Sequence, residues 1–314
     1  MSFMPDRSSA ESPAAERLLI VDGHAYAYRA FYAIRSLSSP AGMATNAIYG
    51  FIRMLGKMLS KVKPSHAIVI WDGGLAPERM KLLPEYKAQR PSMPTDLESQ
   101  LDEIVAYLGA ANIQSYMQES CEADDCIAAL AHQATAAGWE VIIASSDKDF
   151  MQLVSPQVRL LNPNDKSETL WGADEVRAKS GVEPTQIVDW LSLTGDSVDN
   201  IQGVPGVGAK TAANLLHKFG SVDELYRRLA EVEPVRLWSA LHDSQDLVRR
   251  NQALVRLNCQ APCLLSLEVL TMKESNDEAL RDLFVRWGFK TLLRELEEGH
   301  LGPRELFEVK TGAA

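Results

Sequence analysis

The stretch Leu18-Leu19-Ile20-Val21-Asp22-Gly23 decides the fold of this chain. Its four apolar residues have the length and partly β-branched character of a buried strand, and Asp22-Gly23 ends the run with turn residues. The pattern returns in residues 67–72, AIVIWD, and in residues 141–147, VIIASSD. Three short apolar runs that each lead to an aspartate predict three buried strands of one sheet.

Helical patterns alternate with these strands. Apolar side chains recur at helical spacing in residues 44–62 and in the segment from Asp96 to Leu108, and an alanine-rich segment runs from about Glu122 to Ala137. This alternation predicts an α/β fold with a mostly parallel central sheet flanked by helices. Beyond about residue 181 the pattern changes to short helices joined by Gly and Pro, which predicts a smaller, all-helical domain.

The expected division of the chain follows from these patterns. Residues 1–16 are predicted to be a disordered tail, and residues 17–180 an α/β domain with a helical arch around residues 75–95. Residues 181–298 are predicted to be the helical domain, whose last helices pack back on the first, and residues 299–314 a second tail. No apolar run approaches the ~18 residues that span a bilayer, and the first residues lack the apolar segment of a signal peptide.

Charge and cysteine content limit the function. The 314 residues carry a net charge of −10, which argues against a general nucleic-acid coat protein, because such proteins are normally basic. An acidic total is compatible with DNA binding if the carboxylates gather around metal ions. The cysteines form no CxxC pair. In a reducing cytoplasm we therefore expect them to act as small, buried apolar residues, at Cys121, Cys126, Cys259 and Cys263.

Carboxylates concentrate where the carboxyl ends of parallel strands would converge. Three strands lead to aspartates, one helix starts with Glu-Ala-Asp-Asp, and the motifs DKD and DSVD follow. Turn formation or helix capping explains any one of them, but not all of them together. The candidate metal ligands are Asp22, Asp72, Glu122, Asp124, Asp125, Asp147, Asp149, Asp196 and Asp199.

The chemistry of these ligands predicts the metal. Carboxylates packed together repel one another unless cations bind them or their pKa values rise. Oxygen ligands suit Mg²⁺ or Mn²⁺, and the six histidines lack a zinc-like spacing. Two such ions ~4 Å apart would clamp a phosphodiester between them. We therefore predict a two-metal site, on the hypothesis that the nine acids meet at one place.

A glycine-rich turn precedes a helix in residues 203–212, GVPGVGAKTA. Glycines let a backbone approach phosphate, and a helix start offers free amide donors. The spacing is not that of a Walker A loop, but GVPGVG before a helix matches helix–hairpin–helix binders of the DNA backbone. We expect DNA contacts from Gly203, Gly206, Gly208, Lys210 and Thr211.

Two further groups of cations have aromatic neighbours. In the arch, Lys87 and Arg90 are predicted to act on the scissile phosphate, while DNA contacts are expected from Arg79, Lys81 and Tyr86. A solvated basic loop is the simpler interpretation of that segment.

Near the first strand, Arg29 stands among Tyr26, Tyr28, Phe31 and Tyr32. Some of these rings must belong to the core. We take Arg29 as a third catalytic candidate and Tyr26 as a DNA-contact candidate.

Together these motifs resemble the bacterial 5′-to-3′ exonuclease family, which includes the N-terminal nuclease domain of DNA polymerase I and is related to flap endonucleases. The resemblance extends from about residue 18 to about residue 296. It rests on LLIVDGHAYAYRAFYA, NAIYGF, VIWD, YKAQRPSMP, EADD, SSDKDF, LTGDSVDNIQGVPGVGAKTAANLL and GFKTLLREL. The sequence departs from the family pattern at Ser146, where glycine is usual, and at residues 73–77, which are less basic than usual.

The resemblance implies a PIN-like domain with a helix–hairpin–helix (helix-three-turn-helix) domain. The implied activity is hydrolysis of DNA at 5′ ends and single-strand/double-strand junctions, in replication and repair. The nine acids match the family's ligands for two Mg²⁺ (or Mn²⁺), Lys87 and Arg90 match its arch cations, and the 203–210 hairpin matches its potassium-assisted duplex-binding turn. The implied partners are branched, nicked or flapped DNA and a DNA polymerase in trans, for a monomer that is cytoplasmic and nucleoid-associated.

Other functions remain as alternatives. A hydrolase of small phosphate esters would need a second acid after Asp22, and Asp22-Gly23-His24 lacks it. An RNA-cleaving nuclease with a similar acidic site is usually shorter and lacks the 203–210 hairpin. A non-catalytic module that binds branched DNA would be expected to lack some of the nine acids.

Overall fold

A computed structural model describes residues 16–163, 169–262 and 265–299 of the chain. Cys263 and nearly all of the two expected tails, residues 1–16 and 299–314, lie outside these ranges. None of the helices within them combines the length and the apolar character that crossing a bilayer would take.

The centre of the molecule is a six-stranded sheet with the order β3-β2-β1-β4-β5-β6, in which the first five strands run parallel and β6 runs antiparallel to β5. The strands are β1 (Arg17–Asp22), β2 (His66–Trp71), β3 (Gln114–Met117), β4 (Glu140–Ala144), β5 (Val158–Leu161) and β6 (Leu170–Trp171). The predicted mostly parallel sheet is confirmed. Its central strands β1, β2 and β4 are almost entirely buried, which explains their continuous apolar runs.

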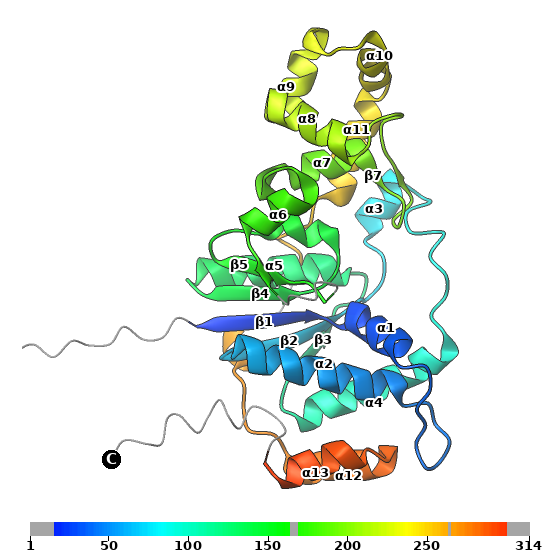
Figure 1. Cartoon of the computed structure of the whole chain (residues 1–314), viewed down its shortest axis with the longest axis vertical. Coiled ribbons are helices and arrows are strands. Elements are labelled where there is room, and N and C mark those ends of the chain that lie inside the picture. Colours follow the sequence, from blue (N-terminus) through cyan, green and yellow to red (C-terminus); the bar gives the residue numbers. More distant parts are fainter. Residues whose placement is uncertain (1–15, 164–168, 263–264, 300–314) are drawn as a thin grey trace, which may run out of the picture.

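Helices cover both faces of this sheet (Figure 1). One core cluster joins alternate residues of β1, β2 and β4, such as Leu18 and Ile20, to α5 (Ala123–Ala136). The other cluster joins the intervening residues, such as Leu19 and Val21, to α1 (Gly23–Ala33), α2 (Asn46–Val62) and α4 (Thr95–Ala110). The alternation of side chains along each strand therefore divides the core into two layers.

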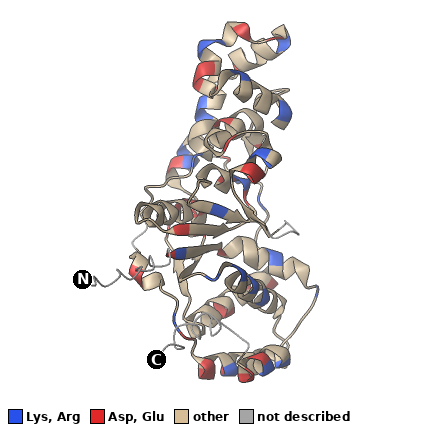
Figure 2. Cartoon of the chain, turned by 60° about the vertical axis from the view of Figure 1, so that its left-hand side comes forward, with Lys and Arg blue, Asp and Glu red and all other residues tan. Residues whose placement is uncertain are grey.

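The second half of the chain is mostly helical and extends from one end of the sheet (Figure 1). Lys and Arg residues are interspersed with Asp and Glu residues along its helices (Figure 2). Its elements are α6 (Ala173–Ser180), η2 (Pro184–Gln186), α7 (Ile187–Thr194), β7 (Gly195–Asp196), β8 (Ile201–Gln202), α8 (Ala209–Phe219), α9 (Val222–Arg227), η3 (Leu229–Glu231), α10 (Val235–Asp243) and α11 (Gln245–Val255).

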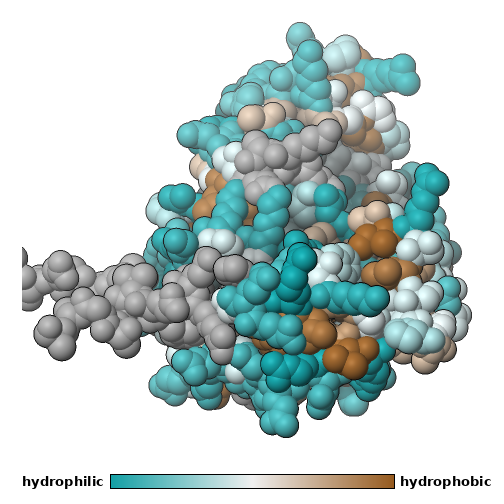
Figure 3. All heavy atoms as spheres, turned by 60° about the horizontal axis from the view of Figure 1, so that its bottom comes forward, coloured by the Kyte–Doolittle hydropathy of each residue, from teal (hydrophilic) through white to brown (hydrophobic). Residues whose placement is uncertain are grey.

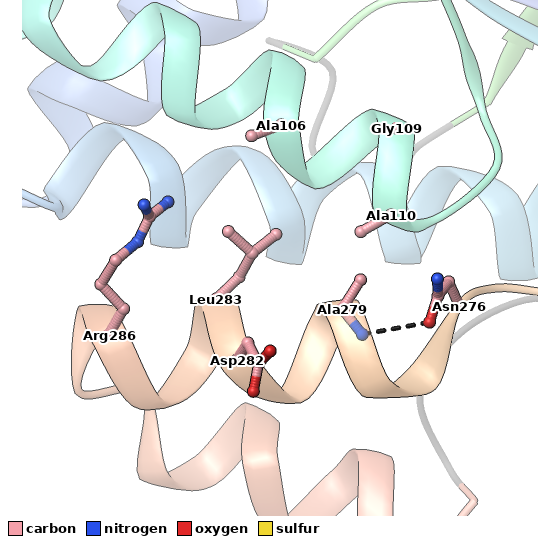
Figure 4. Close-up of a pocket in the computed structure, with 8 residues that line it drawn as sticks. All are labelled: Ala106, Gly109, Ala110, Asn276, Ala279, Asp282, Leu283 and Arg286. Atoms are coloured by element: carbon pink, nitrogen blue, oxygen red, sulfur yellow. Dashed lines mark hydrogen bonds between the residues drawn. The ribbon is translucent and has the colours of Figure 1, made fainter.

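The chain then returns to the opposite end of the molecule through η4 (Leu267–Leu270), where α12 (Asp277–Trp287) and α13 (Lys290–Glu297) pack on the α2–α4 layer. The surface seen from this end is mainly hydrophilic, with hydrophobic residues interspersed (Figure 3). A shallow pocket between α4 and α12 is lined by Ala106, Gly109, Ala110, Asn276, Ala279, Asp282, Leu283 and Arg286 (Figure 4).

Several elements differ from the expectation. Sequence patterns did not predict β3, β5 or β6, nor β7 and β8 in the half expected to be all helical, because these strands have at most four residues and β3 is only partly buried. They also missed the 11 residues of α1, because the Asp22-Gly23 pair at its start has the pattern of a turn. The segment expected to form a helical arch, around residues 75–95, contains a short helix, α3 (Pro77–Leu82), which is followed by turns. Proline at its first turn fits this helix, since the missing N–H has no partner at that position.

Candidate metal centre

Three aspartates lie at the carboxyl edge of the sheet. Asp22 ends β1 and pairs in register with Ile70 of β2, which Asp72 follows two residues later. Asp147 follows β4, and Ser145 connects it to β1: the Ser145 hydroxyl donates to Asp22 Oδ2 at 2.8 Å and accepts from the backbone N–H of Asp147 at 3.1 Å. The ends of adjacent strands are therefore held together by one serine.

Three more acids converge from two distant segments. Asp149 lies in η1 (Lys148–Leu153), Asp196 in β7 and Asp199 in the turn between β7 and β8. One carboxylate oxygen of each lies within 4.8 Å of the others, and all three residues are buried. Asp149 Oδ1 has no hydrogen-bond partner. A buried carboxylate oxygen without a partner is costly, and a bound cation would satisfy it.

Electrostatic repulsion links these acids into one cluster. Burial raises the pKa of Asp22 to about 6. Burial, with Asp147 next, raises the pKa of Asp124 well above its usual range, and burial, with Asp147 and Asp196 next, does the same for Asp149. These couplings define the seven-acid cluster Asp22, Asp72, Asp124, Asp147, Asp149, Asp196 and Asp199. Closely packed acids with raised pKa values fit a site for hard divalent cations.

Glu122 and Asp125 meet a different cation. They share one helix face, as their spacing predicts, and Arg79 occupies it, with Nη1 at 3.0 Å from Glu122 Oε1 and two bonds of 2.7 and 2.8 Å to Asp125. Arg79 also donates to the carbonyls of Leu254 and Arg256. Both Asp125 oxygens are bonded to a buried guanidinium, and Glu122 is paired with the same group, so the structure places these two acids apart from the seven-acid cluster. Their role as metal ligands stays a prediction.

The turn after α3 carries the two predicted arch cations to the acids. Lys87 is buried and forms an ion pair with Glu122, and its Nζ lies 3.9 Å from Asp199 Oδ2. Arg90 Nη2 lies 2.5 Å from Asp199 Oδ1. Burial alone would lower the pKa of Lys87, but the surrounding carboxylates raise it. Lys87 has φ of 57°, a conformation that non-glycine residues rarely adopt.

Three of the predicted DNA contacts are corrected by burial. Tyr26 is 2% exposed and its hydroxyl donates to a backbone carbonyl. Tyr86 is 3% exposed and its hydroxyl donates to carboxylates of the site, and Arg79 is buried among protein partners. These side chains support the site from inside, because their polar atoms already have partners in the interior. Arg29 and Lys81 are exposed.

The glycine-rich turn, residues 203–208, joins β8 to α8, and we call it the α7–α8 turn because it completes the connection between those two helices. A Cβ on Gly203 would lie 2.2 Å from the last carbonyl oxygen of α7, so only glycine fits there. Gly206 has φ of 79°, and Gly208 is the N-cap of α8, which places the first free amides of that helix beside the turn. Lys210 is exposed in the first turn of α8, and Thr211 beside it is partly exposed.

Sequence reasoning missed three residues of the site. Ser145 could have been predicted as a site residue, because it directly follows β4 at the edge of the sheet where the acids gather. His24 Nδ1 accepts the backbone N–H of Asp72 at 3.1 Å, and Lys148 Nζ lies 3.2 Å from Asp196 Oδ1. Lys148 stands within the DKD motif, but no local pattern predicts that its partner is 48 residues away.

The chain matches two family models. Residues 17–181 match the model described as 5′-3′ exonuclease, N-terminal resolvase-like domain, and residues 182–278 match the 5′-3′ exonuclease, C-terminal SAM fold. A 5′-3′ exonuclease of Aquifex aeolicus is 38% identical over 281 residues, which are 90% of this chain and 95% of that protein.

Two further similarities concern a longer protein and a solved structure. DNA polymerase I of Bacillus subtilis is 39% identical over 285 residues, or 90% of this chain, but the chain spans only 32% of its length. A crystal structure of the bacteriophage T5 D15 flap endonuclease with DNA and metal ions has a TM-score of 0.63 at 21% identity, covering 94% of this chain and 99% of that one. At that identity the likeness shows the shared fold. On the family models and the Aquifex relative, this chain belongs to the 5′-3′ exonuclease family.

Proposed function

We propose that this chain is a structure-specific 5′ nuclease that hydrolyses DNA phosphodiesters at 5′ ends and at single-strand/double-strand junctions, in replication and repair. The observation that carries the proposal is the convergence of the buried acids Asp149, Asp196 and Asp199, of which Asp149 has a carboxylate oxygen without a hydrogen-bond partner. The Aquifex relative is named a 5′-3′ exonuclease, and the T5 flap endonuclease was crystallised with DNA and metal ions, which supports the same chemistry here.

The metal of this proposal is Mg²⁺ or Mn²⁺, in two positions. Oxygen ligands alone favour these ions over zinc. Asp149, Asp196 and Asp199 would hold one ion, while the remaining acids of the seven-acid cluster, with Asp124 at their centre, would hold the other. Bound divalent cations would polarise the phosphodiester and stabilise the charge that develops during its hydrolysis.

The chain's own cations would bind the substrate. Lys87 is buried against Glu122, and Arg90 is exposed beside Asp199. A phosphate that entered the site next to them could take over their charge-assisted hydrogen bonds. Arg29 is exposed on α1, the helix that starts at Asp22, and would contact the same strand of DNA. These residues would orient the scissile phosphate and compensate its charge, a positioning effect that can contribute much of the rate.

Away from the metal centre, the α7–α8 turn would bind the DNA backbone. Its glycines allow a phosphate to approach, and Lys210, Thr211 and the amides at the start of α8 would donate to it, with K⁺ as a proposed cofactor of that turn. Lys81, exposed on α3, would add a phosphate contact. We further propose action as a monomer, at the nucleoid, alongside a DNA polymerase in trans, since the relatives include DNA polymerases I.

The test is cleavage of 5′-flap, nicked, gapped and RNA–DNA substrates by the purified protein with and without Mg²⁺. We expect metal-dependent cutting of the flap and nick, and its loss in Asp124→Asn and Asp147→Asn while DNA binding persists. Cutting without metal, or cutting by the double variant, would contradict the proposal. Preference for RNA would favour the RNA-cleaving alternative, and binding without cutting would favour the non-catalytic module.

A further inference from the structure

Two buried thiols lie next to each other at the start of α5. Cys121 ends the loop that follows β3, and Cys126 lies in the second turn of the helix. Their Sγ atoms are 3.1 Å apart, and neither cysteine forms a disulfide in the structure. Cys121 is 8% exposed and Cys126 is fully buried. The pair differs in this respect from Cys259, which is only partly buried in the described part of the chain.

The separation of the two sulfur atoms is close to what a disulfide needs. A disulfide brings its sulfur atoms to about 2.05 Å, so closing this pair takes a movement of about 1 Å. Cys126 is fixed within α5, where its backbone N–H donates to the carbonyl of Glu122 and its side chain belongs to the core. Most of the movement would therefore fall on Cys121 and its loop.

The segment between the two cysteines carries acids that lie in or beside the site. The sequence Cys121-Glu-Ala-Asp-Asp-Cys126 encloses three of the nine acids. The carbonyl of Cys121 accepts the backbone N–H of Gly73 at 3.1 Å, and the carbonyl of Gly73 accepts from Ser120 at 2.9 Å. Gly73 directly follows Asp72. A displacement of Cys121 would therefore reach Glu122 on one side and Asp72 on the other.

We propose that Cys121 and Cys126 form a reversible intramolecular disulfide, with a peroxide as oxidant, and that this disulfide slows the nuclease. The inference rests on the proposed function for its effect on rate, but not for the bond itself. Hydrogen peroxide, small enough for a buried site, oxidises the Cys121 thiol to a sulfenic acid and releases one water. The Cys126 sulfur then attacks Cys121 and expels a second water. In total, two thiols and one peroxide give one disulfide and two waters.

The experiment uses the full chain in two matched backgrounds. Cys259→Ser/Cys263→Ser retains only the pair, whereas Cys121→Ser/Cys126→Ser retains only the other two cysteines. Each protein is treated with hydrogen peroxide without added metal, quenched with catalase, alkylated and digested. We expect the peptide that contains both Cys121 and Cys126 to lose two hydrogens and to take up no alkyl group until dithiothreitol is added.

Two functional readouts follow on the same samples. In the background that retains the pair, we expect flap cleavage to fall by at least about tenfold on oxidation, the size typical of displaced supports of a metal site, and to return with dithiothreitol. The rise in Tm caused by Mg²⁺ should shrink in parallel. Cys121→Ser/Cys126→Ser should show neither change. If that variant fails to fold, the single variant Cys126→Ala serves, since one remaining thiol cannot close the bond.

Two results would overturn the inference. In one, both cysteines can still be alkylated after peroxide treatment of the folded protein, although the same treatment links them in the urea-unfolded chain. The other is a disulfide that forms while cleavage and the Mg²⁺-induced rise in Tm stay unchanged. A reduced protein that cuts none of the substrates would instead contradict the proposed function. In that case the alkylation pattern and the Mg²⁺-induced rise in Tm would still show whether the disulfide forms and whether it affects metal binding.

Discussion

Arg79 and Asp125 form a two-pronged ion pair, with Nη1–Oδ2 at 2.7 Å and Nη2–Oδ1 at 2.8 Å, in which both side chains are about 7% exposed. The same guanidinium donates to Glu122 and to the carbonyl of Leu254 at the end of α11. One buried cation therefore connects the arch helix α3, the acid-bearing start of α5 and the helical half of the chain.

Removing this cation should destabilise the fold. Arg79→Ala leaves the buried Asp125 carboxylate without its cation, although the backbone N–H of Asn258 still donates to it at 2.8 Å, and we expect a loss of about 3–5 kcal/mol in urea unfolding. Arg53→Ala is the matched control, because Arg53 pairs with Glu295 at 2.6 Å on the surface and should cost at most about 1 kcal/mol. Equal losses in the two variants would show that the Arg79 network does not stabilise the protein.

Neighbouring aspartates of α5 should respond with opposite signs. Asp124 is repelled by Asp147 and Asp22, so Asp124→Asn should raise the Tm of the metal-free protein at pH 8 while abolishing cleavage. Asp125→Asn weakens the ion pair with Arg79, so it should lower Tm. It should also retain a higher cleavage rate than Asp124→Asn. Thermal unfolding and single-turnover cleavage measure both. A lower Tm in both variants would refute the division of these acids between two roles.

Stability should depend on pH and on metal together. Burial raises the pKa of Asp22 from 3.8 to about 6, so the folded state holds a proton that the unfolded chain releases. This contribution is complete below pH 3.8 and is lost as the pH rises through about 6. Metal binding replaces the lost proton, so Mg²⁺ should raise Tm more at pH 8 than at pH 5. An equal rise at both values would mean that protons and Mg²⁺ do not compete for these acids.

Lys87 should affect catalysis more than binding. Its ammonium group is buried against Glu122 and lies near Asp199, among the acids of the site. Lys87→Ala should therefore lower the single-turnover cleavage rate by about 100-fold, the scale of one lost electrostatic contact, with little change in duplex affinity. Lys81→Ala, which removes an exposed lysine of the same arch, is the control. An equal loss of rate and affinity in Lys87→Ala would make it a general phosphate contact.

Lys210 should show the reverse behaviour. Its exposed position at the start of α8 predicts a phosphate contact, so Lys210→Ala should weaken duplex binding and reduce the slope of log affinity against log salt by about 1. Lys290→Ala removes an equal charge from α13 at the opposite end of the molecule and should leave the slope unchanged. Identical slopes for wild type and Lys210→Ala would remove this turn from the DNA-binding surface.

Much of the sheet and of the site was predictable, because the decisive signals are local. A fully buried strand needs a continuous apolar run, and the acids directly follow such runs at Asp22, Asp72 and Asp147. Parallel strands then bring their ends to one edge whatever the length of the connections. The glycine-rich turn at residues 203–208 is equally local, since its backbone geometry requires glycine.

The partners that the basic and aromatic side chains contact were not predictable from the sequence. Arg79 and Tyr86 stand in a segment rich in Pro and basic residues, a composition that a solvated loop and a buried support share. Their partners Glu122 and Asp125 are 36 to 46 residues away in the sequence. The helical period places Glu122 and Asp125 on one face, but it does not indicate whether a metal or a guanidinium lies there.

Asp196 and Asp199 are carried by β7, β8 and the turn between them, in the helical half of the chain, yet they complete a site whose other members follow the strands of the sheet. Neither half is therefore a self-sufficient catalyst. A fragment that ends at residue 181 would retain the sheet and lose two of the three converging carboxylates. A chimaera that exchanges the helical half between relatives would have to transplant residues 195–202 in register, so these two halves are expected to be inherited as one unit.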